Sequence, residues 1–412
     1  MPIVTIDDCE HHDWQKGFAL SSRRVFFDDT TREFLHALSL AILKHPDARQ
    51  YPDLVTFAYF CRKANLHALS QRYDDATQRS GWGTVVHIAP SNIPINFAFS
   101  LVFGLLAGNS NIVRMPSRHF PQNDLFVEIF DQVSASPRFQ SIGNSTRLIR
   151  SSRGDKGFER LIGQADGLVV WGGDATVSAF RALPKTPRCV EIYFPDRKSS
   201  MAIDASAYMT VSRDVQQTLA ASFFNDTYLV DQNACSSPSM IFWIGDVETA
   251  GVAKDLFWNT LEDELINRNY QLDTTARIDK FLDIMSANEQ LGRAVHLQTY
   301  SRDIWCLNEQ IRPQTLQLRF GAFLDIDLPS IDGIPAFLRS QEQTLTYFGL
   351  DPHALRQALN HHHHTIDRIV PAGSALSIDP FWDGKDILAL LSHRLELIEP
   401  ARKMRAPAPS VC

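Results

Sequence analysis

Short apolar runs alternate with longer amphipathic stretches along the first half of the chain. Residues 84–88 are rich in β-branched side chains and predict a strand, which a turn at Pro90-Ser91-Asn92 follows. Pro94 suits the first turn of the next helix, which we expect to end at Gly108. This helix is apolar on all sides, which predicts that it is buried.

The same alternation continues beyond this first unit. We expect strands at residues 111–114, 146–150, 168–171, 189–193 and 201–203, and helices at residues 123–133 and directly after Gly172-Gly173-Asp174. Strands that alternate with helices imply a mostly parallel, doubly wound α/β sheet, and such sheets bind ligands at the carboxyl ends of their strands. The loops at residues 90–92, 114–118 and 172–174 lie at such ends.

The pattern divides the chain into three parts. Residues 1–75 read as mostly helical, with polar turns near Asp28 and at His45-Pro46-Asp47, and we expect residues 1–211 to combine these helices with a Rossmann-like cofactor domain. Residues 212–370, with a helix at 215–228 and a loop around Cys235, predict an α/β catalytic domain. Residues 371–412 would form a C-terminal return segment and a basic, proline-rich tail.

Composition excludes several classes of function. The net charge of −7 over 412 residues argues against a nucleic-acid binder. The six cysteines are scattered, so neither a structural zinc site nor a disulfide framework is expected. The first residues lack a basic segment followed by an apolar one, so we expect no signal peptide. The apolar stretch at residues 93–108 is shorter than the ~20 residues that span a bilayer, so we expect no stable membrane insertion and a cytoplasmic, reducing setting.

Cys235 is the strongest candidate for chemistry. It lies in the polar loop Asp231-Gln232-Asn233-Ala234-Cys235-Ser236-Ser237, between a helical segment and an apolar run. A thiolate is both a good nucleophile and a good leaving group, so a cysteine held there can accept an acyl group and release it again. The alternative is a small buried hydrophobe, as most lone cysteines are, but the polar neighbours favour the nucleophile.

Two loops are candidates for a dinucleotide cofactor. Gly172 and Gly173 follow a strand and open a helix, where backbone N–H groups can hold a phosphate; a structural turn is the alternative. Arg114, Ser117 and Arg118 follow the second strand, where an acidic residue would select NAD and an arginine accommodates the 2′-phosphate of NADP. The residues favour NADPH, and a solvated basic loop is the alternative.

Three further residues or runs have two interpretations each. Asn92 could donate to a developing oxyanion, or it could only cap a helix or close a turn. The run His361-His362-His363-His364 lacks the spacing of a metal site, so we expect an exposed run and no metal. His87 lies within an apolar strand and is interpreted as a core histidine with its hydrogen bonds satisfied.

Longer motifs occur in order over residues 80–390: HIAPSNIPINF (87–97), GLLAGNSNIVR (104–114), WGGDAT (171–176), NDTY (225–228), QNACSSP (232–238), RIVPAG (368–373) and FWDGKD (381–386). Together they resemble the bacterial acyl-CoA reductase family (LuxC-type), the fatty acyl reductases of the aldehyde dehydrogenase superfamily. The resemblance implies an aldehyde-dehydrogenase-like α/β fold, with a doubly wound Rossmann-type cofactor domain and an α/β catalytic domain.

The resemblance also assigns residues. It makes Cys235 the catalytic cysteine and Asn92 the partner of the cysteine's own N–H in an oxyanion hole. It places Pro90, Ser91, Arg114, Ser117, Arg118, Gly172 and Gly173 at the cofactor, with Arg114 at a position that usually holds a lysine and Ser117 where NAD-preferring members tend to have glutamate. Glu191 would match the general-base glutamate, but Ile192-Tyr193-Phe194 replaces the glycine pair expected after it.

The function implied is NADPH-dependent reduction of a fatty acyl thioester, as acyl-CoA or acyl-protein, to the aldehyde through an acyl-cysteine. Thioester reduction needs no base to activate water, so it tolerates a mismatched glutamate. The alternatives are an aldehyde dehydrogenase working in the oxidative direction, an acyl-protein reductase fed by a partner acyl synthetase or acyl transferase, and a non-catalytic scaffold. The resemblance also implies a homo-oligomer.

Overall fold

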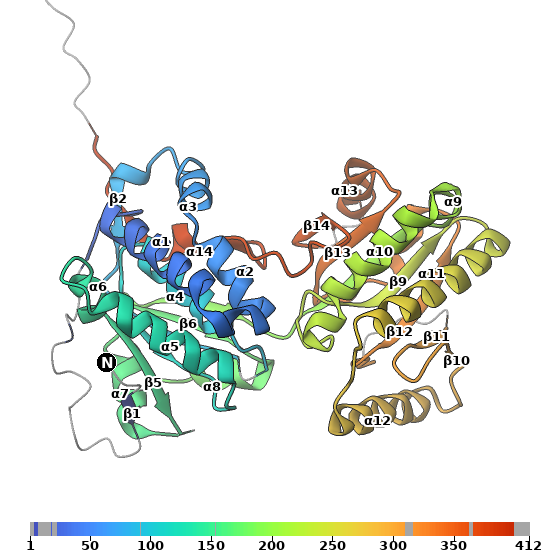
Figure 1. Ribbon diagram of the computed structural model, residues 1–412, viewed down its shortest axis with the longest axis horizontal. Helices are drawn as coiled ribbons and strands as arrows, with labels where there is room; N and C mark the ends of the chain where they lie inside the picture. Colours follow the sequence, from blue (N-terminus) through green and yellow to red (C-terminus); the bar gives the residue numbers. More distant parts are fainter. Residues whose placement is uncertain are drawn as a thin grey trace, which may run out of the picture.

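The computed structural model describes residues 4–6, 18, 23–90, 92–152, 154–309, 316–361 and 366–398. Two lobes lie side by side, and each is built around its own sheet (Figure 1). The chain fills the first lobe, crosses to the second near residue 195, and returns to the first lobe close to its C-terminus. The α/β fold class predicted from the alternating pattern is confirmed.

The first lobe contains a six-stranded sheet in the order β1-β5-β4-β3-β6-β7, with all neighbouring strands parallel. The strand order reverses at β3, so the loops after β3 and β6 leave neighbouring strand ends, the usual ligand position in such sheets. The strands are β1 (Val4–Ile6), β3 (Thr84–Ile88), β4 (Ser110–Arg114), β5 (Thr146–Ser151), β6 (Gly167–Trp171) and β7 (Val190–Phe194).

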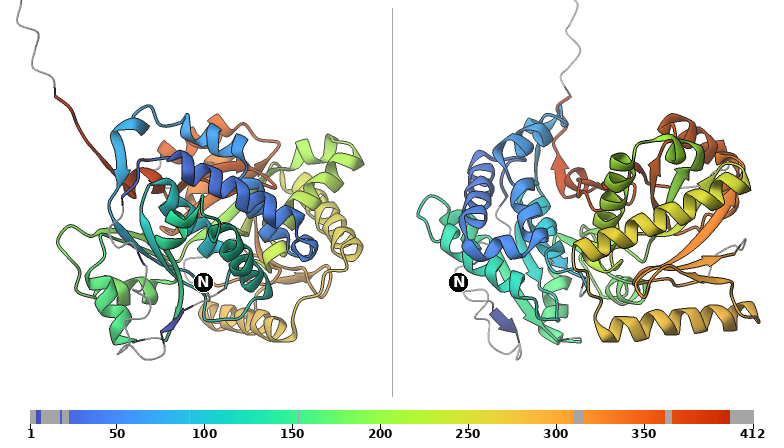
Figure 2. Two further views of the ribbon diagram at one scale, coloured as in Figure 1. Left: turned by 60° about the vertical axis from the view of Figure 1, so that its left-hand side comes forward. Right: turned by 45° about the vertical axis from the view of Figure 1, so that its right-hand side comes forward.

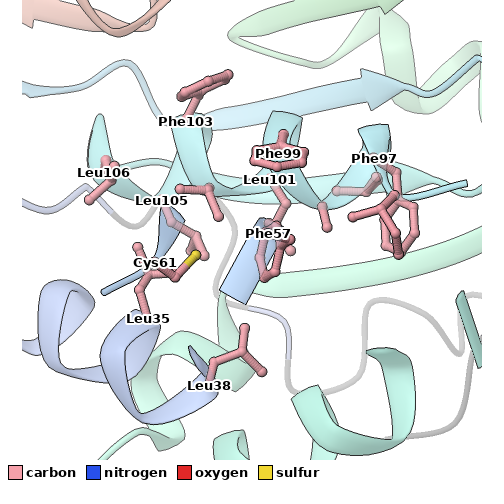
Figure 3. Close-up of a cluster of buried hydrophobic side chains, with 14 of the residues drawn as sticks. Leu35, Leu38, Phe57, Cys61, Phe97, Phe99, Leu101, Phe103, Leu105 and Leu106 are labelled. Atoms are coloured by element: carbon pink, nitrogen blue, oxygen red, sulfur yellow. The ribbon is translucent and has the colours of Figure 1, made fainter. Parts of the chain in front are cut away.

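Helices cover both faces of this sheet, as in a doubly wound fold. One face carries α1 (Asp29–Lys44), α2 (Pro52–Phe60), α3 (Lys63–Ser70), α4 (Asn96–Leu106), α5 (Pro121–Ser134) and α6 (Gln140–Asn144), and the other carries α7 (Lys156–Gly163) and α8 (Asp174–Arg181). Aromatic and aliphatic side chains of α1, α2 and α4 interlock in the larger core (Figure 3). Phe57 is fully buried and meets the Phe99 ring edge-on at 5.2 Å.

The local predictions for this lobe hold closely. The strand expected at residues 84–88 is β3, and the helix expected after it is α4, which is buried along its whole length and is followed by Gly108 at φ +91°. The helix starts at Asn96 rather than at Pro94, because residues 94 and 95 form a turn before it. His87 is fully buried, with Nδ1 2.8 Å from Ser100 Oγ and Nε2 3.0 Å from Asn111 Oδ1, which confirms the core interpretation.

The second lobe is built on a seven-stranded sheet in the order β10-β11-β12-β9-β8-β13-β14, parallel except for the β10–β11 pair. Its strands are β8 (Lys198–Asp204), β9 (Pro238–Ile244), β10 (Leu297–Thr299), β11 (Trp305–Asn308), β12 (Ala322–Leu328), β13 (Glu342–Phe348) and β14 (Arg368–Pro371). Its helices are α9 (Ala205–Thr210), α10 (Arg213–Asp226), α11 (Val247–Asn267), α12 (Thr274–Leu291) and α13 (Pro352–His361).

One predicted strand belongs to the other sheet. The sequence pattern assigned residues 201–203 to the first sheet, but β8 pairs with β9 and β13 in the second. The sheets therefore change between Phe194 and Lys198, ahead of the boundary predicted at residue 211. A buried strand has the same apolar pattern in either sheet, so local sequence could not decide its neighbours.

The C-terminal segment crosses back over both lobes, as Figure 2 shows from two sides. Its hairpin of β15 (Phe381–Trp382) and β16 (Lys385–Asp386) leads into α14 (Ile387–Leu390), and β17 (Ser392–Arg394) pairs antiparallel with β2 (Arg79–Gly81). Within the described ranges, no helix is long and apolar enough to cross a membrane. The side chains of the histidine run at 361–364 lie outside the described residues.

Candidate active site

A cavity of about 470 Å³, here called the interlobe cavity, is lined by residues from three parts of the chain, and several of the predicted site residues are among them. The first lobe lines it with the loop after β3 and the turn after β6, the second lobe with the cysteine loop, and the return segment with Trp382 and Asp383. The predicted site residues that line it are Pro90, Asn92, Gly172, Gly173 and Cys235. Ser91 lies outside the described residues.

The cysteine loop is held in place by its own Gln232. The backbone is left-handed at Asp231 (φ +50°) and at Gln232 (φ +58°), a conformation that non-glycine residues adopt at a cost. The buried Gln232 amide donates to Pro238 O (2.9 Å) and accepts from Gly321 N (2.8 Å), so the loop is tied to the strand beside it. The two Gln232 hydrogen bonds offset the cost of the left-handed backbone, and they hold the loop in a conformation in which Cys235 lines the cavity.

Cys235 is partly buried, and its surroundings favour the protonated thiol. Ser199 Oγ donates to the Cys235 carbonyl at 2.8 Å, and Gln343 Nε2 lies 3.5 Å from Sγ. Burial, followed by the nearby Asp383 carboxylate, raises the pKa of the thiol to about 11. A raised pKa favours the thiol over the thiolate at neutral pH, so forming the nucleophile requires a proton acceptor.

Asn92 reaches across the cavity to the cysteine loop. Its Nδ2 donates to Asn233 O at 3.1 Å, a contact between residues 141 positions apart in the sequence. The tertiary structure thus places the predicted oxyanion donor in contact with the loop that carries the predicted nucleophile, and both residues line the cavity. Its role in binding an oxyanion stays a prediction.

The glycine turn has a structural explanation of its own. Asp196 Oδ2 accepts from Asp174 N at 3.1 Å, at the start of α8, and a Cβ on Gly173 would lie 2.9 Å from the same oxygen. Gly173 therefore lets the Asp196 carboxylate approach the helix N-terminus, where a negative charge is favourable. The Asp196 carboxylate thus occupies the helix N-terminus in this structure, and phosphate binding at the turn stays a prediction.

The arginine loop lies apart from the cysteine. Arg114 donates from Nη2 to Ser151 O at 2.9 Å at the end of the neighbouring strand, and the Arg118 guanidinium lies 5.2 Å from the Phe120 ring centre. None of the three described candidates in this loop, Arg114, Ser117 and Arg118, lines the interlobe cavity. They flank the carboxyl end of β4, so only an extended ligand could touch both regions.

Glu191, the third predicted catalytic residue, does not line the interlobe cavity. Side chains alternate along β7, so Ile192 and Phe194 face one side of the sheet and Glu191 the other. Its carboxylate accepts from the Tyr193 hydroxyl and lies 3.3 Å from Lys185 Nζ. The residue of β7 that faces the cavity at this strand end is Phe194, so the structure does not bring Glu191 to the other predicted catalytic residues.

Sequence reasoning missed four residues at the site. Phe194 stacks on Trp171 (ring centres 3.8 Å apart) and both line the cavity, while Gln343 and Asp383 lie beside the thiol. Only Asp383 had a readable signal, since the dipeptide Asp-Gly predicts a two-residue hairpin turn. Trp171, Phe194 and Gln343 lie within buried strands, whose local pattern does not show which side chains face a cavity.

Comparison with known proteins agrees with this geometry. The family described as "Acyl-CoA reductase (LuxC)" matches residues 60–273, more than half of the chain. The chain is similar to "Long-chain acyl-protein thioester reductase" of Aliivibrio fischeri, at 26% identity over 206 residues, covering 49% of this chain and 40% of that protein. The protein of the same name from Vibrio harveyi is 28% identical over 166 residues, covering 40% and 32%. The matches thus span less than half the length of these relatives.

Solved structures support the fold. A 1-pyrroline-5-carboxylate dehydrogenase from Thermus with bound NAD superposes with a TM-score of 0.63 at 12% identity, covering 89% of this chain and 81% of that chain. At this identity the likeness shows the fold alone, which is that of the aldehyde dehydrogenases. The motifs around Asn92 and the glycine turn, the cysteine loop that closes on them and the match over residues 60–273 agree: the chain belongs to the acyl-CoA reductase (LuxC) family.

Proposed function

We propose that this protein reduces a fatty acyl thioester to the aldehyde through an acyl group carried on Cys235. The observation that carries the proposal is that Cys235, Asn92 and the glycine turn of the first-lobe sheet line one cavity, with Asn92 hydrogen-bonded to the cysteine loop at Asn233 O. Family membership and the names of the bacterial relatives support the same activity.

In the proposed reaction, Cys235 Sγ attacks the thioester carbonyl. Asn92 Nδ2 and the Cys235 backbone N–H would hold the oxyanion that forms, a contribution of about 3 kcal/mol for one such donor. The carbon–sulfur bond of the substrate then breaks and its thiol leaves, which gives the acyl-cysteine. After reduction, the Cys235 hemithioacetal collapses to the aldehyde and restores the sulfur.

The proposed cofactor, NADPH, would bind at the carboxyl ends of the strands of the first-lobe sheet. The turn at Gly172-Gly173 follows β6, beside the point where the strand order of the sheet reverses, which is the usual ligand position in such sheets. Bound NADPH would supply the hydride for the acyl carbon. Trp171 and Phe194 would shield that carbon from water, since their stacked rings line the cavity at the end of β6 and β7.

Two features favour reduction over oxidation. Oxidation of an aldehyde to an acid needs a base that activates water against the acyl-cysteine. The cavity-facing end of β7 presents the Phe194 ring, and the Glu191 carboxylate lies on the other side of the sheet. The end of β7 therefore offers the acyl-cysteine no carboxylate base that could activate water.

The cavity also suits an aliphatic substrate. Apolar side chains of both lobes and the return segment line it, namely Ile93, Phe99, Leu229, Val230, Leu376 and Ile378. An acyl chain against this wall would be removed from water, at roughly 0.8 kcal/mol for each buried CH₂.

A panel of saturated acyl-CoAs of rising chain length, assayed with NADPH by nicotinamide absorbance, tests the proposal. We expect aldehyde formation that improves as the chain lengthens, because each CH₂ adds apolar contact. Decanal with NADP and no CoA should give a much slower reaction. Faster acid formation from decanal than aldehyde formation from decanoyl-CoA would contradict the proposed direction.

The acyl carrier is a second part of the proposal. Because both bacterial relatives are named acyl-protein thioester reductases, we propose that an acyl-activating synthetase or acyl transferase can supply the acyl group in place of free CoA. We also propose a homo-oligomer, as the family resemblance implies. A cytoplasmic location is proposed because the free thiols of Cys61, Cys189, Cys235 and Cys306 suit a reducing compartment.

For cofactor choice, we propose that Arg114 favours NADPH by contact with the 2′-phosphate. Arg114→Glu should raise the KM for NADPH about tenfold or more and change that for NADH far less, because an ion-paired hydrogen bond is worth about 1.5–3 kcal/mol. Steady-state kinetics with both cofactors measures the ratio. The exposed Arg188, replaced by Glu, is the control. An equal loss with NADPH and NADH would remove Arg114 from the cofactor site.

A further inference from the structure

Asp383 lies at the tip of the hairpin that the return segment extends into the interlobe cavity. Phe381–Trp382 pairs with Lys385–Asp386, so Asp383 and Gly384 form a two-residue turn, with φ +49° and +67°. Such a turn accepts Asn or Gly at the first position as readily as Asp. The fold therefore explains a small turn residue here, but it does not explain a carboxylate that is only 7% exposed.

Gln343 joins this carboxylate to the nucleophile. Gln343 is fully buried on β13, and its Nε2 donates to Asp383 Oδ1 and lies 3.5 Å from Cys235 Sγ. The Thr344 hydroxyl donates to Gln343 Oε1 at 3.3 Å, which fixes the orientation of the amide. The Cys235 thiol and the Asp383 carboxylate thus both contact the Gln343 Nε2 atom. One water molecule could bridge two groups placed in this way.

The other carboxylate oxygen is available. Among the described residues, the buried Asp383 Oδ2 has no hydrogen-bond partner, although Asp383 lines the cavity beside the thiol. A buried acceptor without a partner is costly, so native structures usually retain one for a reason. A proton or a water molecule shared with the Cys235 thiol would satisfy it.

Charged groups on several elements surround this pair. Arg197 before β8, Arg368 on β14 and Lys385 on β16 favour an ionised Asp383, and Asp367 opposes it. Burial is the largest influence and raises the pKa of Asp383. The same burial and the Asp383 charge raise the pKa of the thiol, so carboxylate and thiolate together are disfavoured and one proton between them is favoured.

We propose that Asp383 is the general base for Cys235, with Gln343 as the residue that positions the two. This inference rests on the proposed acyl transfer. As the bond from Cys235 Sγ to the acyl carbon forms, the thiol proton passes to the Asp383 carboxylate, directly or through one water molecule. As the carbon–sulfur bond of the substrate breaks, the proton passes from Asp383 to the departing thiolate, so acylation neither consumes nor releases a proton.

The substitution Asp383→Asn tests whether Asp383 acts as a general base or only shapes the hairpin turn. Asparagine keeps the size and accepts the left-handed turn, so the fold should persist. Loss of the negative charge should lower the Cys235 thiol pKa by about one unit, so that iodoacetamide alkylates Cys235 faster at pH 8. Loss of the base should slow acylation by decanoyl-CoA on the order of a hundredfold. Alkylation is followed on the Cys235 peptide by mass spectrometry, and acylation as CoA released in a single turnover without NADPH.

For Asp383→Asn we expect alkylation of Cys235 to become faster and acylation of Cys235 to become slower. Asp327→Asn is the matched control, because Asp327 pairs with Lys254 away from the cavity and should alter neither rate. If Asp383→Asn slows both reactions, speeds both or changes neither, Asp383 is not the base. Asp383→Gly also suits the turn and should show the same split, so a folding defect in one variant does not decide the outcome.

Failure of the proposed function would look different. If wild-type protein releases no CoA from decanoyl-CoA, acyl transfer to Cys235 is wrong, and the role of Asp383 falls with it. If wild-type protein acylates but forms no aldehyde with NADPH, only the reduction is wrong. The assignment of Asp383 is then still decided by the acylation and alkylation rates of the variants.

Discussion

Replacing Cys235 by alanine should abolish both acyl labelling and NADPH oxidation, with a loss of turnover of at least ~10⁴-fold. The other described cysteines, Cys61, Cys189 and Cys306, do not line the interlobe cavity. The loss of one partly buried sulfur leaves the Gln232 bonds that shape the loop in place. We therefore expect the variant to fold and to bind NADPH with unchanged affinity.

The measurement is incubation with a radiolabelled acyl-CoA, followed by denaturation and counting of protein-bound label, with and without NADPH. Cys189→Ala is the matched control, because Cys189 is also a partly buried free thiol but lies outside the cavity lining. Wild-type and Cys189→Ala proteins should carry label that NADPH removes as aldehyde. Label on the Cys235→Ala protein at the wild-type level would assign the nucleophile to another residue.

Replacing Asn92 by alanine should lower turnover by on the order of a hundredfold, which corresponds to about 3 kcal/mol. Both acylation and reduction pass through a tetrahedral carbon with a negative oxygen, so one lost donor should slow both steps. Asn92 also bridges the lobes through Asn233 O, but it is exposed, so thermal stability should change little.

Single-turnover rates of CoA release and of aldehyde formation test this role, with Asn92→Asp as a second variant that keeps the shape and removes the donor. Asn65→Ala serves as the control, because the Asn65 amide also donates to a backbone carbonyl, Phe60 O at 2.7 Å, far from the site in the fold. A rise in KM with an unchanged turnover number would show that Asn92 binds the ground state only.

The outcomes at Glu191 and Asp383 show where local sequence ceases to be informative. Glu191 was chosen by position in a motif, but the face of β7 to which a side chain points depends on the register of the strand, and a shift of one residue reverses it. Asp383 lies in a segment that could be recognised as a hairpin turn. Its contact with Gln343 joins the turn of the β15–β16 hairpin to a strand of the second sheet, and nothing local to either residue encodes it.

The sequence alone determined the elements and the chemical types of residue. Apolar and β-branched runs determined β3 and β4, the all-round apolar pattern determined that α4 is buried, and the polar loop made Cys235 the candidate nucleophile. These features depend on backbone preferences and on burial, both of which act over a few neighbouring residues.

The tertiary structure alone decided which of these groups meet. It placed β8 in the second sheet, directed Glu191 away from the cavity, brought Asn92 to the cysteine loop, and set Asp383 beside the thiol. The physical reason is that strand neighbours and interlobe contacts depend on how whole surfaces pack together. Such contacts join residues far apart in the chain, so no local pattern specifies them.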